Sequence, residues 1–285
     1  MSAKLKYLAK YLAVGTPIAH SLSPALHNTV YEQLELNREL VARDPGNTKD
    51  FAVLLQDLRA GQYQGFCVTI PYKLAAAHAC DDLSFIAQRT GAANYIRRNS
   101  DGSLSGDNTD VVGFLNALDM QLGLKPAGLN VCICGSGGAA KAACEALLMH
   151  GVSQVTMVSR NPTALIGAIG NDSGAHALRI VSYDTLHQMD CRFDLLVNAT
   201  PLGMDNDLLP VRHDWMHSAT DAVFDIVYRR DGITPLVAAA QRMEIPAIDG
   251  RAMLIEQAAY GMHFWGVDAD VAQLRSIMEA VLLFS

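Results

Sequence analysis

The sequence lacks the features that would tie it to a membrane or to nucleic acid. No apolar run reaches the ~18–20 residues that span a bilayer. The N-terminal "YLAVG" is too short for the apolar core of a signal peptide. Lysines and arginines form no run, and the net charge is -7, so neither nucleic acid nor an anionic membrane is expected as a partner. We therefore expect a cytoplasmic protein with a small-molecule partner.

Motifs of several catalytic and metal-binding classes are also absent. The nine histidines form no H-x-x-H or H-E-x-x-H pattern, and we expect no metal site. No G-x-S-x-G turn is present, which weakens a hydrolase interpretation. The cysteines show neither a C-x-x-C pair nor a zinc spacing. Cys132 and Cys134 alternate within an apolar run, which predicts two buried core thiols.

Half of the 285 residues are apolar and 18% are charged, which allows a well-filled core. The first ~110 residues alternate strand-like runs ("YLAVGTP", "GFCVTIP", "ANYIRR") with helix-like ones, a pattern typical of α/β packing. The middle of the chain, "LNVCICGSGGAAKAACEALLMHGVSQVTMV", reads as a βαβ unit. Further strands are predicted at "ALRIVSY", "FDLLVNAT", "AVFDIVY" and "IPAID", and the end of the chain reads as two amphipathic helices.

A glycine-rich turn joins the first strand and the helix of this βαβ unit. "GSGGAA" follows "NVCIC" directly, with the G-x-G-x-x-A spacing of a dinucleotide-binding turn. Gly135 permits the tight turn, Gly137 lets the backbone approach a pyrophosphate, and Ala140 lets the helix pack closely on the sheet. The N–H groups at the helix start would then face the anion. The alternative is a glycine-rich turn that binds nothing.

The end of the next strand selects between the two nicotinamide cofactors. An acidic residue there would hold the ribose 2′-hydroxyl of NAD, whereas an arginine accommodates the 2′-phosphate of NADP. Arg160 stands at this place, and no Asp or Glu falls between Ser159 and Leu165. The sequence therefore favours NADP, with NAD as the alternative. An exposed arginine without a ligand is the other interpretation.

Side chains that could handle protons follow a strand of the first region. Thr69 and Lys73 lie just past "GFCV", and Pro71 ends that strand because proline cannot donate to a ladder. A lysine there can give a proton to a developing alkoxide or take one up; otherwise it is a surface lysine. Asp110 precedes an apolar helical run, where it is either an N-cap or the charged partner of Lys73.

Two serines precede the first long helical run. "HSLSPALHN" contains Ser21 and Ser23, with Pro24 suited to the first helical position. Ser23 alone is explained as a helix cap. As a pair, the two hydroxyl groups could also anchor a carboxylate without adding charge.

The order of the motifs resembles one family nearly from end to end. "GTPIAHSLSPALHN" resembles the opening serine motif of the shikimate/quinate dehydrogenase family, "GFCVTIPYK" its G-x-N-V-T-x-P-x-K, and "GDNTDVVGF" its G-x-N-T-D-x-x-G. "GAANY", "GSGGAAKA", "VNATPLGM", "DIVYRRDGITPL" and "DGRAMLIEQAAYGMHFW" follow in the family's order. Several independent motifs in one order are more specific than any one of them.

The resemblance implies an α/β fold of two domains, with the active site in the cleft between them. Residues 1–112 and 251–285 would form the substrate-binding catalytic domain. Residues 113–250 would form an NAD(P)-binding, Rossmann-like domain with a doubly wound parallel sheet. The implied activity is an NADP-dependent interconversion of 3-dehydroshikimate and shikimate. The partner would be a polyhydroxylated ring carboxylate, and the protein a monomer or a homodimer.

Site residues carry over from the family position by position. Lys73 and Asp110 would be the catalytic pair at the hydroxyl being oxidised. Ser21 and Ser23 would bind the substrate carboxylate, and the substrate-binding residue Tyr228 would lie near it. The ring hydroxyls would be bound by Thr69, Asn94 and Gln257. The pyrophosphate would be held by Gly135, Gly137, Gly138 and Ala139. The nicotinamide and its ribose would be lined by Asn198, Thr200, Met204 and Gly250.

Four places depart from the family pattern. Cys67 stands where the family usually has Asn, Tyr95 where it has Thr, and the loop after Tyr228 is one residue longer. "SRNP" replaces the common Asn-Arg-Thr, which weakens the NADP interpretation without reversing it. One alternative is therefore a paralogue that acts on quinate or a related cyclohexane carboxylate with NAD or NADP. Another is a non-catalytic ligand sensor, which would not need both Lys73 and Asp110. A folate-type dehydrogenase is disfavoured, since it would not need the paired serines or "NATPLGM".

Overall fold

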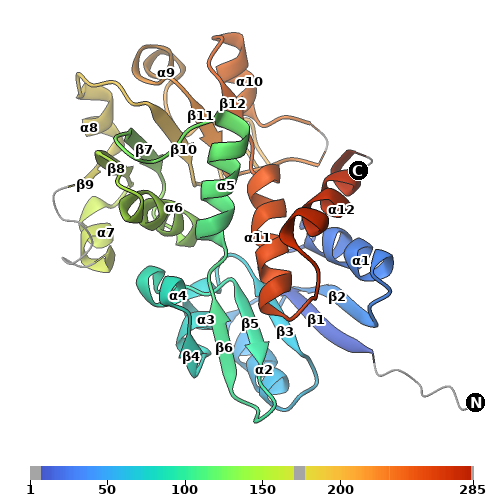
Figure 1. The fold of residues 1–285 in the computed structure, drawn as a ribbon. Coiled ribbons are helices and arrows are strands. Elements are labelled where there is room, and N and C mark those ends of the chain that lie inside the picture. The colour runs from blue at the N-terminus through green and yellow to red at the C-terminus, as the bar shows by residue number, and fades with distance from the viewer. Residues whose placement is uncertain (1–7, 170–176, 231, 284–285) are drawn as a thin grey trace, which may run out of the picture. The chain divides into compact units, whose positions relative to one another are not determined.

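The computed structural model describes residues 8–169, 177–230 and 232–283, and the chain divides into two compact units. The first unit comprises residues 1–109 and 255–285, and the second comprises residues 110–254. The chain passes between the units at the start of α5 (Asp110–Leu122) and within α11 (Arg251–Phe264), both visible in Figure 1. Among the described residues, no helix is long and apolar enough to cross a membrane.

The first unit is built on a mixed sheet in the strand order β2-β1-β3-β5-β6-β4. β1 pairs in parallel with β2 and β3, whereas β5 runs antiparallel to both β3 and β6. The strands are β1 (Ala9–Val14), β2 (Arg38–Arg43), β3 (Gly65–Val68), β4 (Asp82–Leu83), β5 (Tyr95–Arg98) and β6 (Leu104–Asp107). The helices are α1 (Ser23–Gln33), α2 (Thr48–Arg59), α3 (Lys73–Ala79), α4 (Phe85–Thr90) and α12 (Val271–Leu283), the last of which packs on α1.

Alternation along the strands divides the core of the first unit between the two faces of its sheet. One face, which includes Leu12 and Phe66, packs against α2 and α3. The other face presents Tyr95, whose ring lies 4.8 Å from that of Trp265 and directly against Gly261 of α11. Helices therefore cover both faces, and the strand ends are left to carry the loops.

The second unit is a parallel sheet in the strand order β12-β11-β10-β7-β8-β9. Its strands are β7 (Asn130–Cys134), β8 (Gln154–Val158), β9 (Leu178–Val181), β10 (Leu195–Asn198), β11 (Val223–Asp225) and β12 (Ala247–Ile248). Besides α5, its helices are α6 (Gly138–Met149), α7 (Pro162–Ile169), α8 (Tyr183–Gln188), α9 (His213–Ala219) and α10 (Pro235–Arg242). The predicted βαβ unit and doubly wound sheet are confirmed.

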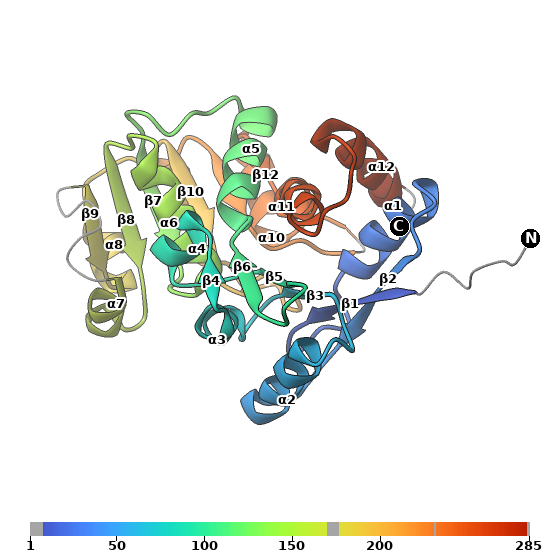
Figure 2. The ribbon, with the colours of Figure 1, turned by 60° about the horizontal axis from the view of Figure 1, so that its bottom comes forward.

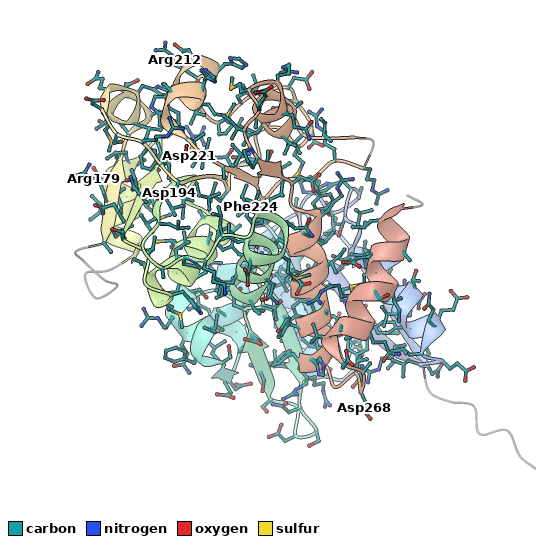
Figure 3. The ribbon with its side chains drawn as sticks, turned by 45° about the horizontal axis from the view of Figure 1, so that its top comes forward. Arg179, Asp194, Arg212, Asp221, Phe224 and Asp268 are labelled. Carbon is teal, nitrogen blue, oxygen red and sulfur yellow. The ribbon has the colours of Figure 1, made fainter. Side chains whose placement is uncertain are left out.

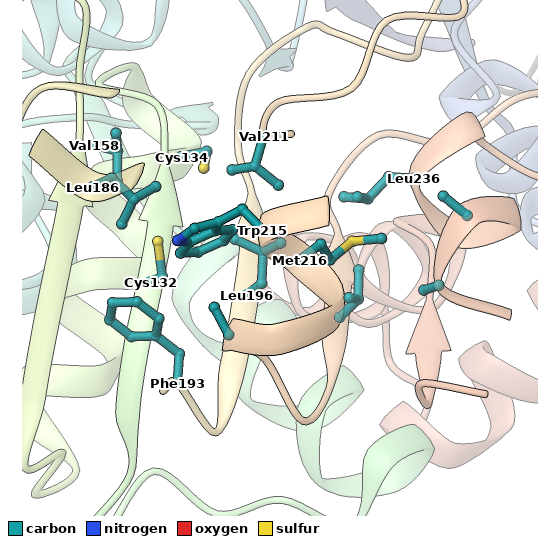
Figure 4. Close-up of a cluster of buried hydrophobic side chains, with 14 residues drawn as sticks. Cys132, Cys134, Val158, Leu186, Phe193, Leu196, Val211, Trp215, Met216 and Leu236 are labelled. Carbon is teal, nitrogen blue, oxygen red and sulfur yellow. The ribbon is translucent and has the colours of Figure 1, made fainter. Parts of the chain in front are cut away.

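Apolar layers lie on both faces of this second sheet. On one face, Trp215 and Met216 of α9 pack against Cys132 of β7 and its neighbours (Figure 4). On the other face, α5 packs against α6 (Figure 2). Phe114 of α5 stacks on Phe224 of β11 with ring centroids 5.1 Å apart, and Figure 3 labels Phe224. The thiols of Cys132 and Cys134 are fully buried, as predicted.

The contact between Gly261 and Tyr95 predicts that one substitution changes stability in opposite directions, depending on whether the Tyr95 ring is present. A Cβ at Gly261 would lie 2.0 Å from the Tyr95 ring, so we expect Gly261→Ala to lower the free energy of unfolding by about 1–3 kcal/mol, the usual cost of overpacking. In a Tyr95→Ala background the ring is gone and alanine is the better helix former, so Gly261→Ala should stabilise by about 0.5–1 kcal/mol. Urea unfolding of the four proteins measures both effects, and equal losses in the two backgrounds would refute the contact.

Candidate active site

Several loops of the first unit meet at one edge of its sheet. The carboxyl ends of β1, β3 and β6 lie there beside the amino end of β5, because β5 runs antiparallel to its neighbours. Thr69, directly after β3, donates its N–H to the Val14 carbonyl at 2.8 Å, and Asn94 donates its N–H to the Asp107 carbonyl at 3.0 Å. The edge thus brings the predicted residues Thr69 and Asn94 onto adjoining loops.

Lys73 belongs to the same edge. It is the first residue of α3 and is half-buried. Its carbonyl accepts a hydrogen bond from the N–H of Ala93 at 2.9 Å, next to Asn94. The backbone of the predicted catalytic lysine is therefore tied to the loop that carries a predicted ring-binding amide.

Asn94, Thr109 and Gln257 form a buried hydrogen-bonded cluster. Asn94 Oδ1 accepts from the N–H of Thr109 at 2.8 Å, while Asn94 Nδ2 donates to Thr109 Oγ1 at 3.0 Å and to Gln257 Oε1 at 3.2 Å. The Thr109 hydroxyl donates to the backbone carbonyl of Gln257 at 2.9 Å. Two of the predicted ring-binding side chains thus meet, although they are far apart in the chain. Thr109 was not predicted from the sequence, where its only signal is its place beside Asp110.

Asp110 directly follows this cluster in the chain. It is buried and is the first residue of α5, and its alternative role as an N-cap stays a prediction. Asp110 belongs to the second unit and Lys73 to the first, and their pairing stays a prediction.

The paired serines lie at the start of α1, but Ser23 does not cap it. Ser23 is the first residue of the helix, Leu22 precedes it as the N-cap, and no side chain makes the capping bond. The hydroxyl of Ser21 instead accepts from the N–H of Ser23 at 3.2 Å. The interpretation of Ser23 as a helix cap is therefore wrong, and Pro24 occupies the second helical position rather than the first.

A buried histidine, to which the sequence analysis assigned no role, braces this first turn of α1. His27 Nδ1 lies 2.8 Å from the Ser23 carbonyl oxygen, and its Nε2 lies 3.0 Å from the Tyr95 hydroxyl. Because a carbonyl can only accept, Nδ1 carries the proton, Nε2 accepts, and the Tyr95 hydroxyl donates. Burial lowers the pKa of His27 to about 4, which keeps the ring neutral and this arrangement intact near pH 7.

The predicted cofactor residues gather at the carboxyl edge of the second sheet. All of its strands are parallel, so the loops after them open at the same edge. The loops after β7, β8, β10 and β12 carry Gly135, Gly137, Arg160, Thr200, Met204 and Gly250. Gly138 and Ala139 begin α6, Asn198 ends β10, and the predicted substrate residue Tyr228 lies on the loop after β11. The strand order reverses between β7 and β10, where Gly135 has φ +127° and a Cβ would lie 2.7 Å from the Ala199 carbonyl oxygen.

The residues at this reversal fit a dinucleotide with a 2′-phosphate. Gly137 is the N-cap of α6 and has no side chain that could cap it, so the N–H groups of the first turn can face an anion. Ala140 is fully buried against the sheet, as predicted. Arg160 is exposed just beyond β8, where it can meet a phosphate. Within the described residues, no group of three or more His, Cys, Asp or Glu side chains could hold a metal ion.

A buried carboxylate joins the loops after β10 and β11. Asp225 Oδ1 accepts from Asn198 Nδ2 at 2.8 Å and from the Val227 N–H at 3.1 Å, and Oδ2 accepts from the Thr234 hydroxyl at 2.6 Å. Burial raises the pKa of Asp225 to about 6, against the lowering effect of these hydrogen bonds. Thr234 also caps α10. One carboxylate therefore orders two loops and the start of a helix.

The side-chain amide of Asn198 makes all of its hydrogen bonds to other groups of the protein. Besides Asp225, its Nδ2 donates to the Leu202 carbonyl at 3.0 Å, and its Oδ1 accepts from the N–H and the hydroxyl of Thr200 at 3.0 and 2.7 Å. Both amide protons and both lone pairs are then engaged. Asn198 and Thr200 shape the turn that presents Met204.

Tyr228 and Gly250 lie on neighbouring loops. The N–H of Gly250 donates to the Val227 carbonyl at 3.0 Å, and a Cβ at Gly250 would lie 2.0 Å from the Ile226 carbonyl oxygen. Only glycine can approach that strand end so closely. Tyr228 is the residue directly after Val227 and is half-buried.

The fold and the site together define a class of protein. A parallel sheet whose strand order reverses beside a glycine-rich turn is the architecture of a dinucleotide-binding unit. The other unit presents a lysine, hydroxyl groups and amides at one sheet edge. This combination is that of a dinucleotide-dependent oxidoreductase with two α/β units.

Comparison with known proteins identifies the family. Residues 13–96 match the family model of the shikimate dehydrogenase substrate binding domain. A shikimate dehydrogenase (NADP(+)) of Rubrobacter xylanophilus is 36% identical over 267 residues, 92% of either chain. One of Xanthomonas euvesicatoria is 36% identical over 288 residues, 97% of this chain and 98% of its own. The chain belongs to the shikimate dehydrogenase family.

A solved structure agrees with these relatives. It is the crystal structure of shikimate 5-dehydrogenase from Thermus thermophilus in complex with NADP(H) and shikimate. That chain superposes with a TM-score of 0.80 at 30% identity, and the match covers 96% of this chain and 99% of that one. The likeness therefore extends over both units.

The buried His27 predicts a pH-dependent stability of the first unit. Its pKa falls from the ordinary 6.5 to about 4 on folding, so the unfolded chain binds more protons between these values. Its contribution is complete above pH 6.5 and is lost as the pH falls toward 4. Relative to His27→Gln, the wild type should lose about 2–3 kcal/mol of stability between pH 7 and pH 4.5.

Denaturant unfolding followed by tryptophan fluorescence measures this difference. In a Trp215→Phe background the signal comes from Trp265, which lies in the same unit as His27 with ring centroids 5.7 Å apart. If the stability difference between wild type and His27→Gln is the same at both pH values, His27 is not held neutral by burial.

Proposed function

We propose that this chain catalyses the NADP-linked interconversion of shikimate and 3-dehydroshikimate. In one direction, shikimate and NADP⁺ give 3-dehydroshikimate, NADPH and a proton. The observation that carries the proposal is the Asn94–Thr109–Gln257 cluster, which sets two hydroxyl-binding side chains beside the loop of Lys73 and directly before Asp110. When bound, NADP supplies a nicotinamide ring that takes a hydride from the carbinol carbon or returns it to the ketone.

Lys73 and Asp110 handle the proton in this proposal. In oxidation, the amine of Lys73 takes the proton of the reacting hydroxyl group; in reduction, its ammonium group returns one to the developing alkoxide. The carboxylate of Asp110 orients Lys73; in reduction it then accepts a hydrogen bond from the hydroxyl group that has formed.

The remaining side chains anchor the substrate at the other positions of its ring. The hydroxyls of Ser21 and Ser23 donate to the carboxylate, together with Tyr228. Thr69, Asn94 and Gln257 bind the ring hydroxyls. Neither serine side chain caps α1, and the Tyr95–His27–Ser23 chain of hydrogen bonds holds the backbone of their turn.

The second unit holds NADP through its sheet edge in this proposal. Gly135, Gly137, Gly138 and Ala139 receive the pyrophosphate, and Arg160 meets the 2′-phosphate. Asn198 and Thr200 act by shaping the turn, since their polar groups are engaged internally. Met204 and Gly250 line the nicotinamide end.

Replacement of the catalytic lysine is the direct test of the proposed chemistry. Lys73→Met should lower kcat for shikimate oxidation by ~10²–10⁴-fold, the usual contribution of a general acid–base group. Lys49→Met, an exposed lysine of the same unit, is the control and should keep the wild-type rate. The appearance of reduced nicotinamide measures both. A kcat within about threefold of wild type in Lys73→Met would remove this role.

The choice of cofactor depends on Arg160. Arg160→Ala should lower kcat/KM for NADP⁺ by about 10–100-fold, because it removes charge-assisted hydrogen bonds to the 2′-phosphate. The value for NAD⁺ should change by less than about threefold, since NAD⁺ has no such phosphate. Steady-state rates of wild type and Arg160→Ala with NADP⁺ and with NAD⁺ measure both effects. An equal loss with the two, or a wild type that prefers NAD⁺, would argue against the assignment.

A further inference from the structure

We propose that Arg229 is a positioning residue, which holds the loop after β10 and the loop after β11 in one arrangement. This inference rests on the proposed function, because those loops carry Met204 on the cofactor side and Tyr228 on the substrate side. Both loops lie within the second unit. Arg229 therefore acts on both ligands without having to touch either.

The guanidinium group of Arg229 grips the backbone of the loop after β10. Its Nε donates to the Gly203 carbonyl at 2.7 Å, and its Nη2 donates to the Asn206 carbonyl. Nη2 also lies 3.0 Å from Asp207 Oδ1. The side chain of Arg229 is 21% exposed, whereas that of Asp207 is 90% exposed. The contact with the Gly203 carbonyl is thus the sheltered one, whereas the contact with the Asn206 carbonyl lies at the surface. The ion pair with Asp207, also at the surface, adds little.

The positions of the two carbonyls in the chain show which segments Arg229 holds in place. Met204 lies between them in the chain, so Arg229 fixes the segment on either side of that side chain. Tyr228 is the residue directly before Arg229, so the same guanidinium also fixes the backbone next to it. The inner end of the loop is held separately, through Asn198 and Asp225.

The turn itself depends on being held from outside. Gly203 has φ +92°, and its N–H donates to Asn206 Oδ1 at 3.2 Å, as the Leu208 N–H does at 3.0 Å. These bonds close the turn on itself but do not join it to the loop after β11. The planar fork of arginine can donate to two carbonyls at once, whereas a lysine offers a single point of charge.

The test compares Arg229→Met with Arg230→Met, which removes the same charge from the exposed neighbour. In the ligand-free protein, amide exchange of residues 199–208 should speed up at least tenfold in Arg229→Met. Calorimetric titration should show Kd for NADP⁺ about tenfold higher, the worth of one charge-assisted hydrogen bond. KM for shikimate should rise by a similar factor while kcat stays within about threefold. Arg230→Met should match wild type, and Arg229→Lys should fall between.

Other outcomes overturn the proposal. If exchange, Kd and KM in Arg229→Met equal those of wild type, the arginine positions nothing. If Arg229→Met lowers kcat and the melting temperature but leaves Kd for NADP⁺ and the KM values for NADP⁺ and shikimate unchanged, Arg229 has only a structural role. A wild type that does not oxidise shikimate would sink the proposed function instead, and amide exchange with the NADP⁺ titration would still decide the role of Arg229.

Discussion

The hydrogen bonds of Asn94 hold the chain at both of its passages between the two units. Thr109, which accepts and donates at Asn94, is the last residue before the first passage, and Gln257 lies just after the second. All three side chains are buried, where an unpaired polar group is costly and a satisfied network is rigid. One amide therefore fixes where Asp110 leaves the first unit and where α11 re-enters it. The proposed chemistry depends on that placement more than on any other contact described.

In each unit, the strand arrangement brings the proposed ligand-binding residues to one edge of the sheet. In the first, the antiparallel β5 brings Asn94 to the edge where β3 presents Thr69. In the second, the reversal of strand order between β7 and β10 opens the edge beside Gly135, and Asp225 orders the loops alongside. Burial of Asp225 and of His27 costs solvation, and the bonds that each makes recover part of that cost. Both residues hold backbone that carries proposed ligand-binding groups.

The sequence predicted elements with a strong local signal and missed those defined by distant partners. The glycine turn between two apolar runs was enough for the βαβ unit. β2 was not predicted, because it is an edge strand of sequence "RELVAR" in which only Leu40 is buried. The capping role of Ser23 was wrong by a single position, since composition does not set the first turn of a helix.

Site residues divide in the same way. Thr69, Lys73 and the glycines stand in motifs that local spacing reveals. Thr109, His27 and Arg229 work through partners that no periodicity connects to them. The loop after Tyr228, which the sequence predicts to be one residue longer than in the family, contains Arg229 and its contacts with the loop after β10.

The comparison of shikimate with quinate as substrates tests the central claim most directly. The account predicts that the purified protein reduces NADP⁺ with shikimate at a kcat/KM at least tenfold above that with quinate, since a site built to hydrogen-bond one set of ring substituents rejects another strongly. A protein that prefers quinate, or that binds shikimate without ever reducing NADP⁺, would contradict it.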